Sequence, residues 1–190
     1  MTAQIPDRVM YNGERYDLIG IKGSELFYPE AYGLKLIMAG TACYNGYILT
    51  FKCDNDEFIL DELLIRTQEE PVEINNIRAE KYEGNWAPMF SHHYSNLQLK
   101  RNFTGEIIIA REFIEEMYVH MGYQSPRAFR QVYRLKIIED KIMEVIDLSK
   151  TMEEKRREDP FKDSTPTNPE DGKSIRAWVD KKFSRDIDEE

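Results

Sequence analysis

The sequence has few cysteines and no apolar run that could span a membrane. Its 190 residues include two cysteines, Cys43 and Cys53, whose spacing matches neither a disulfide framework nor a zinc site. No apolar run approaches the roughly 20 residues that a membrane-spanning helix needs. Residues 1–13 also lack the basic and apolar regions of a secretory signal. We therefore expect a protein of the reducing cytoplasm that has no membrane partner.

Positive charge is scarce as well. The chain has 26 Lys and Arg against 35 Asp and Glu, which gives a formal net charge of −9. Nucleic-acid binding needs a basic surface that neutralises phosphates, so we expect no nucleic acid as the main partner. An acidic surface could bind a basic protein, or it could simply keep the chain soluble.

Motifs of known catalytic chemistry are missing. The sequence contains neither G-x-S-x-G nor H-E-x-x-H. Gly172-Lys173-Ser174 imitates the end of a phosphate-binding loop, but Thr167 stands where that loop needs its first glycine. Metal-ligand spacing is also absent among the three histidines, which are His92, His93 and His120. We expect no catalytic residue, metal ion or cofactor.

Hairpin signals dominate the first third of the chain. Residues 34–67 predict a three-strand meander that turns at Asn45-Gly46 and at 54–56, and Asn12-Gly13 predicts an earlier hairpin. The pairing across the second turn makes one face nearly all apolar, which is what packing on a core requires. On that face we place Tyr47, Leu49, Phe51 and Cys53 opposite Phe58, Leu60 and Leu64.

The second half predicts a helix, a hairpin and a charged helix. An apolar stripe at helical spacing predicts a central helix over residues 111–121. Residues 128–148 alternate as a hairpin around residues 139–141, with Leu135 facing inward and Arg134 outward. Thr151 to Glu154 form a capping box that opens a helix ending near Glu158.

The two hairpins also align with each other. When the two hairpins are aligned at a fixed offset, residues of similar chemical type occupy matching positions, which suggests an internal duplication of the chain. Any two amphipathic hairpins would align about as well, so both interpretations stay open. The coinciding pairs are Ile48/Val132, Phe51/Leu135, Lys52/Lys136, Asp56/Asp140, Phe58/Ile142 and Leu64/Leu148.

These patterns predict an α+β fold made mainly of antiparallel β-sheet, with hairpin lobes that the duplication would relate, one central helix and a C-terminal helical tail. Residues 1–158 are expected to form one β-rich globular domain. Residues 159–173, rich in proline, serine and threonine, are expected to be a linker, and residues 174–190 an amphipathic helical tail.

The tail is the first candidate site. After Ser174, a narrow apolar stripe of Ile175, Trp178, Val179 and Phe183 follows helical spacing. So short a helix is marginal in water, and the stripe therefore needs a surface to bury it. That surface could belong to another protein, to a second copy of the chain, or to the body of this chain.

Two further groups of residues are candidates. Arg127, Arg130, Arg134 and Lys136 form a basic edge suited to a carboxylate, a phosphate or an acidic peptide, or else a solvated strand face. The loop of residues 68–99 could cover a pocket. The side chains expected to line that pocket are Trp86, His92, His93 and Tyr94.

The sequence favours a non-catalytic cytosolic protein-binding module of the immunity, adaptor or accessory-subunit type. Its partner, or a second copy of the chain, would be bound through the C-terminal tail and the acidic surface. The alternative is a small enzyme or small-ligand-binding domain with its pocket under the loop of residues 68–99. A pocket that gathers polar side chains would favour this alternative.

Overall fold

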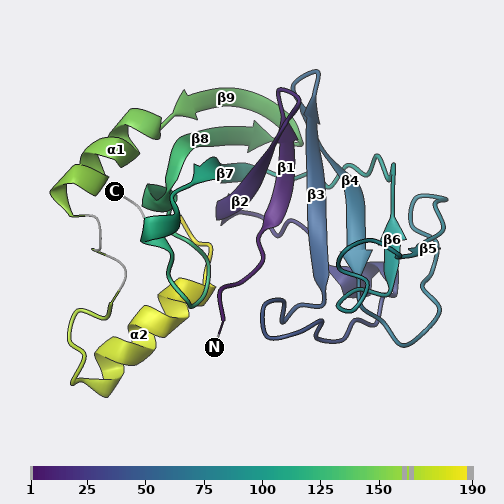
Figure 1. The fold of residues 1–190 in the computed structure, drawn as a ribbon. Coiled ribbons are helices and arrows are strands. Elements are labelled where there is room, and N and C mark those ends of the chain that lie inside the picture. Colours follow the sequence, from purple (N-terminus) through teal and green to yellow (C-terminus); the bar gives the residue numbers. More distant parts are fainter. Residues whose placement is uncertain (1, 160–161, 163–164, 188–190) are drawn as a thin grey trace.

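The computed structural model describes residues 2–159, 162 and 165–187 (Figure 1). Its two α-helices are α1 (Ser149–Glu158) and α2 (Gly172–Phe183), and its short 3-10 helices are η1 (Pro29–Tyr32), η2 (Glu115–Met117) and η3 (Pro126–Ala128). Its strands are β1 (Asp7–Tyr11), β2 (Glu14–Gly23), β3 (Tyr47–Asp54), β4 (Glu57–Ile65), β5 (Glu80–Lys81), β6 (His92–Tyr94), β7 (Gly105–Phe113), β8 (Phe129–Ile138) and β9 (Lys141–Asp147). None of the described helices is long and apolar enough to cross a membrane.

All of these strands belong to one sheet. Their order is β3-β1-β2-β7-β8-β9-β4-β6-β5, and β3 also pairs with β4, so the sheet returns to its first strand. Every pairing between named strands is antiparallel except that of β1 with β3. The predicted fold class, α+β with a mainly antiparallel sheet, is confirmed.

Three hairpins of the sheet turn through two residues with positive φ. These are Asn12-Gly13, Asn55-Asp56 and Glu139-Asp140. Two-residue hairpin turns with both φ values positive match the twist of the flanking strands, and Asn, Asp and Gly reach this conformation most easily. The sequence located all three turns, but it assigned three residues to each of the last two turns instead of two.

β-Bulges change the predicted strand registers. In the β3–β4 pair, Thr50 opposes Glu62 whereas Phe51 opposes Leu60, so β4 has one extra residue at this point. Beyond it, the alternation of side chains along β4 is reversed. Leu63 and Ile65 therefore enter the main core, while Leu64, predicted to face inward, packs with Ile48 on the other face. A similar shift in the β8–β9 pair leaves Met143 without a residue opposite it on β8, and Met143 is 60% exposed.

The predicted first strand of the meander does not form. Residues 34–39 are not a strand, because β1 and β4 already occupy the two edges of β3. The segment instead crosses the end of that hairpin, where the Ile37 N–H donates to the Arg66 carbonyl at 3.0 Å. Gly46 is required by this crossing, since a Cβ there would lie 2.0 Å from the Ile37 oxygen.

The predicted helix over residues 111–121 is also wrong. Arg111 and Phe113 extend β7 by pairing with Gln131 and Phe129 of β8, and only the short η2 follows. The apolar stripe read as helical is buried by other means, because Phe113 and Met117 pack against the cluster on the outer face of the sheet. Pairing with an available strand edge overrides the local helical pattern here.

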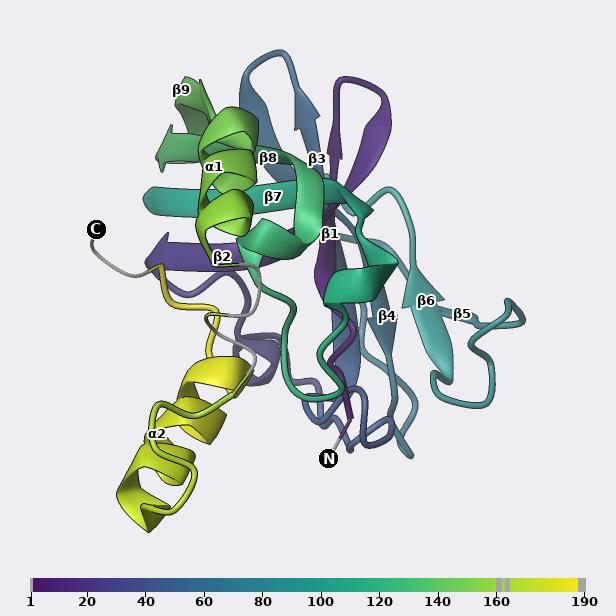
Figure 2. The same cartoon turned by 60° about the vertical axis from the view of Figure 1, so that its left-hand side comes forward.

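Alternation along the strands divides the apolar residues between two faces. The main core lies on the inner face and includes Leu18, Phe51, Ile107, Ile109 and Leu135, all fully buried. On the outer face of β2, β7 and β8 a second cluster packs under α1 (Figure 2). A third cluster packs part of the loop of residues 68–99 against the outer face of β3 and β4.

The β3–β4 and β8–β9 hairpins meet at their turns. The Phe58 N–H donates to the Asp140 carbonyl, and the Ile142 N–H donates to the Asp56 carbonyl, each at 2.7 Å. These four residues are two of the pairs that coincide in the sequence alignment of the hairpins. Such reciprocal bonds are the pattern that a local twofold axis produces. They agree with the internal duplication, which stays a prediction.

The C-terminal segment returns to the sheet. Helix α2 leans away from the body at its N-terminal end, while its C-terminal end lies against it (Figures 1 and 2). After the helix, the Ile21 N–H of β2 donates to the Arg185 carbonyl at 2.7 Å, and the Ile187 N–H donates to the Ile21 carbonyl at 3.2 Å. The predicted amphipathic helix is present, but the segment that follows it is paired with the sheet and is not detached from the domain of residues 1–158.

Candidate anion-binding site

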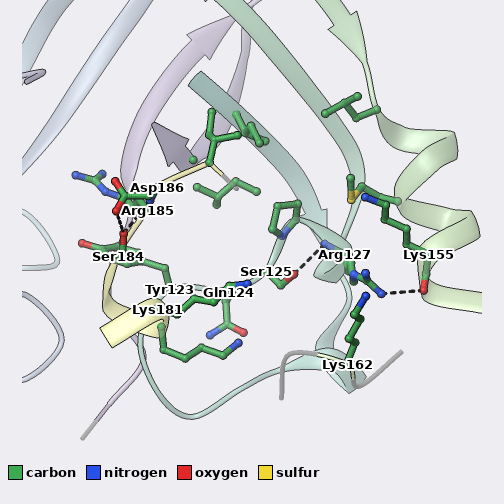
Figure 3. A pocket seen from close by; sticks show the side chains of 18 of the residues that line it. Tyr123, Gln124, Ser125, Arg127, Lys155, Lys162, Lys181, Ser184, Arg185 and Asp186 are labelled. Carbon is green, nitrogen blue, oxygen red and sulfur yellow. Dashed lines mark hydrogen bonds between the residues drawn. The ribbon is translucent and has the colours of Figure 1, made fainter. Parts of the chain in front are cut away.

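A cavity of about 360 Å³ lies where the C-terminal segment meets the outer face of the sheet. Its floor comes from β2, β7 and β8, and α1, η3 and the residues around η3 form one side. Trp178 of α2 and the residues after that helix close the other side. Of these residues, Ser184, Arg185 and Asp186 are labelled in Figure 3. At roughly 30 Å³ per water molecule, the cavity holds about a dozen waters.

The described residues that line this cavity are strongly basic. Seven of them are Lys or Arg and one, Asp186, is acidic, although the chain as a whole has a formal charge of −9. We call this group the basic cavity cluster. It consists of Arg127, Arg134, Lys155, Lys162, Lys181, Lys182 and Arg185.

The cations of the cluster act on each other. Partial burial of Lys155 lowers the pKa of its ammonium group, and the nearby charges of Arg127, Lys162 and Arg134 lower this pKa further, against Glu158, which raises it. A like charge disfavours the charged form of a neighbour, so the part of this lowering that Arg127, Lys162 and Arg134 cause reports mutual repulsion. Negative charge placed in the cavity would relieve it.

Arg127 is held at the junction of η3 and α1. Its backbone N–H donates to the Ser125 hydroxyl at 3.4 Å, and its guanidinium donates to the carbonyls of Lys155 and Asp159 at 3.1 and 3.2 Å (Figure 3). Those carbonyls belong to the last turn of α1, where a cation is favourable. Arg156 fixes the same junction by donating to the Arg127 and Phe129 carbonyls. Arg127 thus has a structural role beside its place in the cavity wall.

Arg134 projects from the outer face of β8, where it stands opposite Ile108 of β7. Its Nε atom is buried and has no hydrogen-bond partner within the described residues, and the Glu106 carboxylate lies 4.0 Å away. A buried N–H without a partner is costly in free energy. Arg134 therefore offers a donor that an anion in the cavity would satisfy.

Arg185 anchors the C-terminal wall. Its guanidinium donates to the Asp7 carboxylate at 2.5 Å and lies over the Tyr123 ring, 5.2 Å from its centre. Burial lowers the pKa of this guanidinium, but Asp7, with smaller contributions from Tyr123 and Tyr47, more than offsets that effect and the net pKa is raised. Beside it, the Tyr123 N–H donates to the Lys182 carbonyl at 2.7 Å. This contact needs Gly122, because a Cβ there would lie 2.1 Å from the Lys182 oxygen.

The rest of the cavity wall is mainly apolar. Ile19, Ile108 and Met152 are buried members of the cluster under α1, and Leu148 and Ile187 pack against that cluster. All five line the cavity, together with Trp178. The cavity therefore combines an apolar wall with cationic groups, as pockets for organic ligands commonly do.

Only two residues of the basic edge predicted from the sequence line the cavity. Arg127 and Arg134 line the cavity, whereas Arg130 and Lys136 are exposed and do not line it. Sequence reasoning missed Lys155 and Lys162, which follow the edge by some twenty residues or more, and Lys181, Lys182 and Arg185 of the C-terminal segment. No local pattern connects Lys181 and Lys182 to β8.

The side chains of the predicted pocket under the 68–99 loop do not converge. Tyr94 is fully buried in the main core, where its hydroxyl donates to the Val72 carbonyl at 2.6 Å. His93 points to the opposite face of β6 beside Tyr82, and His92 contacts the Ser91 hydroxyl. Trp86 packs near Phe90 with the Arg8 guanidinium over its ring.

The apolar stripe of the tail is shared between the body and solvent. The Phe183 ring lies 6.0 Å from the Tyr44 ring, Trp178 lines the cavity, and Val179 is half-buried. Ile175 is 39% exposed. Most of the stripe therefore contacts this chain itself, and association with a partner through the tail stays a prediction.

Neither a metal site nor a reactive thiol is found within the described part of the chain. No three His, Cys, Asp or Glu side chains in it gather closely enough to hold a metal ion. Cys43 borders a smaller cavity of about 180 Å³, but burial raises the pKa of its thiol, which donates to the Tyr47 carbonyl at 3.3 Å. Comparison of the chain with models of protein families, with curated proteins and with solved structures finds no match.

Proposed function

We propose that this chain is a non-catalytic ligand-binding protein that takes an anionic group, phosphate or carboxylate, into the cavity lined by the basic cavity cluster. The observation that carries the proposal is the gathering of seven Lys and Arg side chains around one cavity in a chain of net charge −9. Guanidinium and ammonium groups bind oxyanions through charge-assisted hydrogen bonds. We propose the cytoplasm as its place of action, since both cysteines are free.

The partners of Arg185 and Arg127 are identified, and Arg134 and Lys155 supply further support for anion binding. Asp7 neutralises Arg185, and Arg127 donates to the end of α1. The buried Nε of Arg134 offers a hydrogen-bond donor to an anion, and the charges of neighbouring cations contribute, after burial, to the lowered pKa of Lys155. This function belongs to the class of the sequence-based alternative, a small-ligand-binding domain, but at a different pocket.

Bound anions should stabilise the folded state, because they bind it and not the unfolded chain. At a concentration of about 100 times Kd the gain is about 2.7 kcal/mol, which for a chain of this length raises the melting temperature by about 5–10 °C. The test is thermal unfolding and isothermal titration calorimetry with inorganic phosphate, pyrophosphate and citrate at low ionic strength, with chloride as the reference anion.

A matched pair of double variants tests the site. Arg134→Gln with Lys155→Gln removes two cavity cations, and Arg130→Gln with Lys136→Gln removes two exposed cations from β8. We expect the first double variant to lose the anion response and the second to keep it. Equal responses in both double variants, or no response of the unmodified protein to any of the three anions, would refute the proposal.

A further inference from the structure

The apolar residues that line the cavity beside the cations constrain the ligand further. We infer that the cavity binds an organic phosphate, in which a phosphate ester carries a compact apolar group that lies against Trp178 and the residues under α1. This inference rests on the proposed anion-binding function and specifies its ligand.

The charge of the site favours phosphate over a single carboxylate. Seven cationic side chains and one acidic side chain are among the described residues of the wall. A phosphate monoester carries more negative charge at neutral pH than a carboxylate and offers three acceptor oxygens. It can therefore accept hydrogen bonds from several cations at once, including the Nε of Arg134, which has no hydrogen-bond partner among the described residues.

The size of the cavity favours more than the phosphate alone. Its volume of about 360 Å³ lies at the lower end of the range of roughly 300–1,000 Å³ found for small-molecule sites. An inorganic phosphate would fill only part of this space and leave water against an apolar wall. A ligand whose organic part covers that wall would displace this water, which is favourable.

The apolar wall is preformed and comes from two parts of the chain. Ile108 and Met152 are 6% and 8% exposed, so packing under α1 fixes their positions. Trp178 comes from α2, whose C-terminal end is held by the contacts of Lys182 and Arg185 with the body. A rigid apolar surface beside fixed cations costs little ordering when the ligand binds.

The probe for this inference is 1-naphthyl phosphate, compared by calorimetry with inorganic phosphate and with 1-naphthol. We expect 1-naphthyl phosphate to bind the unmodified protein at least about tenfold more tightly than inorganic phosphate. Trp178→Ala should remove most of this difference while leaving the Kd of inorganic phosphate unchanged. Ile175→Ala is the matched control, because Ile175 lies on the same helix and is not among the cavity-lining residues. 1-Naphthol should bind more weakly than either phosphate, because it lacks the charged group.

The outcomes separate this inference from the proposed function. If inorganic phosphate binds and depends on Arg134 and Lys155, but 1-naphthyl phosphate binds no more tightly, the organic-phosphate inference is refuted and anion binding stands. A tenfold advantage that survives in Trp178→Ala, or one that is lost equally in Ile175→Ala, would also refute it. If neither phosphate binds, the function and this inference both fail.

Discussion

The ion pair between Arg185 and Asp7 should hold the C-terminal segment to the body, and Arg185→Met tests this. The two side chains are 17% and 7% exposed, and they join residues 178 positions apart. The Asp7 carboxylate also accepts a hydrogen bond from the Leu49 N–H at 2.8 Å. Methionine keeps most of the length of the arginine side chain and removes its charge, so Asp7 would remain as a buried charge without its cation.

Removing one partner of a buried pair typically costs about 3–5 kcal/mol, because an uncompensated charge remains. The guanidinium retains some contact with solvent, so we expect about 3 kcal/mol for Arg185→Met, a fall in melting temperature of about 6–12 °C. Truncation after Asp159 should lower it at least as much, since it also removes the backbone bonds of Ile21 and Tyr123 to this segment. This differs from a detached tail, whose removal would leave the melting temperature unchanged.

The assay is urea and thermal unfolding of Arg185→Met beside Arg176→Met, which makes the same charge change on an exposed position of α2. A double-mutant cycle with Asp7→Asn isolates the pair, because the amide oxygen can still accept from Leu49. We expect a coupling energy of about 1.5–3 kcal/mol. If Arg185→Met loses no more stability than Arg176→Met, the C-terminal segment does not dock through this pair and the reasoning is wrong.

Two further predictions concern the Asp140 side chain and the titration of the Cys53 thiol and the Tyr94 hydroxyl. Asp140 accepts hydrogen bonds from the N–H groups of Arg101, Asn102 and Phe103, so Asp140→Ala should cost about 3 kcal/mol or more in urea melts. The control is Asp56→Ala, because Asp56 is exposed and has nearly the same φ as Asp140; it should cost less than about 1 kcal/mol. Equal costs for the two variants would show that the hydrogen bonds of Asp140 do not stabilise the fold. Burial raises the pKa of the Cys53 thiol from 9.0 and of the Tyr94 hydroxyl from 10.0, both to about 12. The folded state therefore holds these protons more tightly, and stability that is complete below pH 9 should fall as pH rises from 9 to 12; urea melts at rising pH whose midpoints stay constant would refute this.

The hairpins could be predicted because their signals are local. Asn12-Gly13 and Asn55-Asp56 mark turns by their own conformational preferences, and alternation placed Leu135 inside, where it is fully buried. The β-bulge opposite Thr50 carries no comparable signal. Because of its one extra residue, Leu63 takes the place on the inner face that Leu64 would otherwise occupy. Both residues are leucine, so the apolar pattern fits both registers.

The missed elements depend on partners that are distant in sequence. The pattern over residues 111–121 is compatible with a helix, but β8 offers an edge that Arg111 and Phe113 extend. Residues 34–39 are compatible with a strand, but β1 takes the edge of β3 by a parallel pairing that a hairpin-by-hairpin interpretation does not consider. In both cases tertiary pairing decides, and propensity is a weak guide.

The cavity was the hardest feature to predict because its cations come from four separate segments, η3, β8, the region of α1 and Lys162, and the C-terminal segment. One sequence signal did point to it. The first hairpin joins a five-residue β1 to a ten-residue β2, so Ile21 lies beyond the reach of β1 and its backbone N–H and C=O need another partner. Backbone groups buried in a sheet are almost always paired. The apolar stripe of the tail likewise needed a surface to bury it. Together, the backbone groups of β2 beyond β1 and the apolar stripe of the tail predict that the tail docks on this chain itself. This docking closes the cavity around its basic side chains.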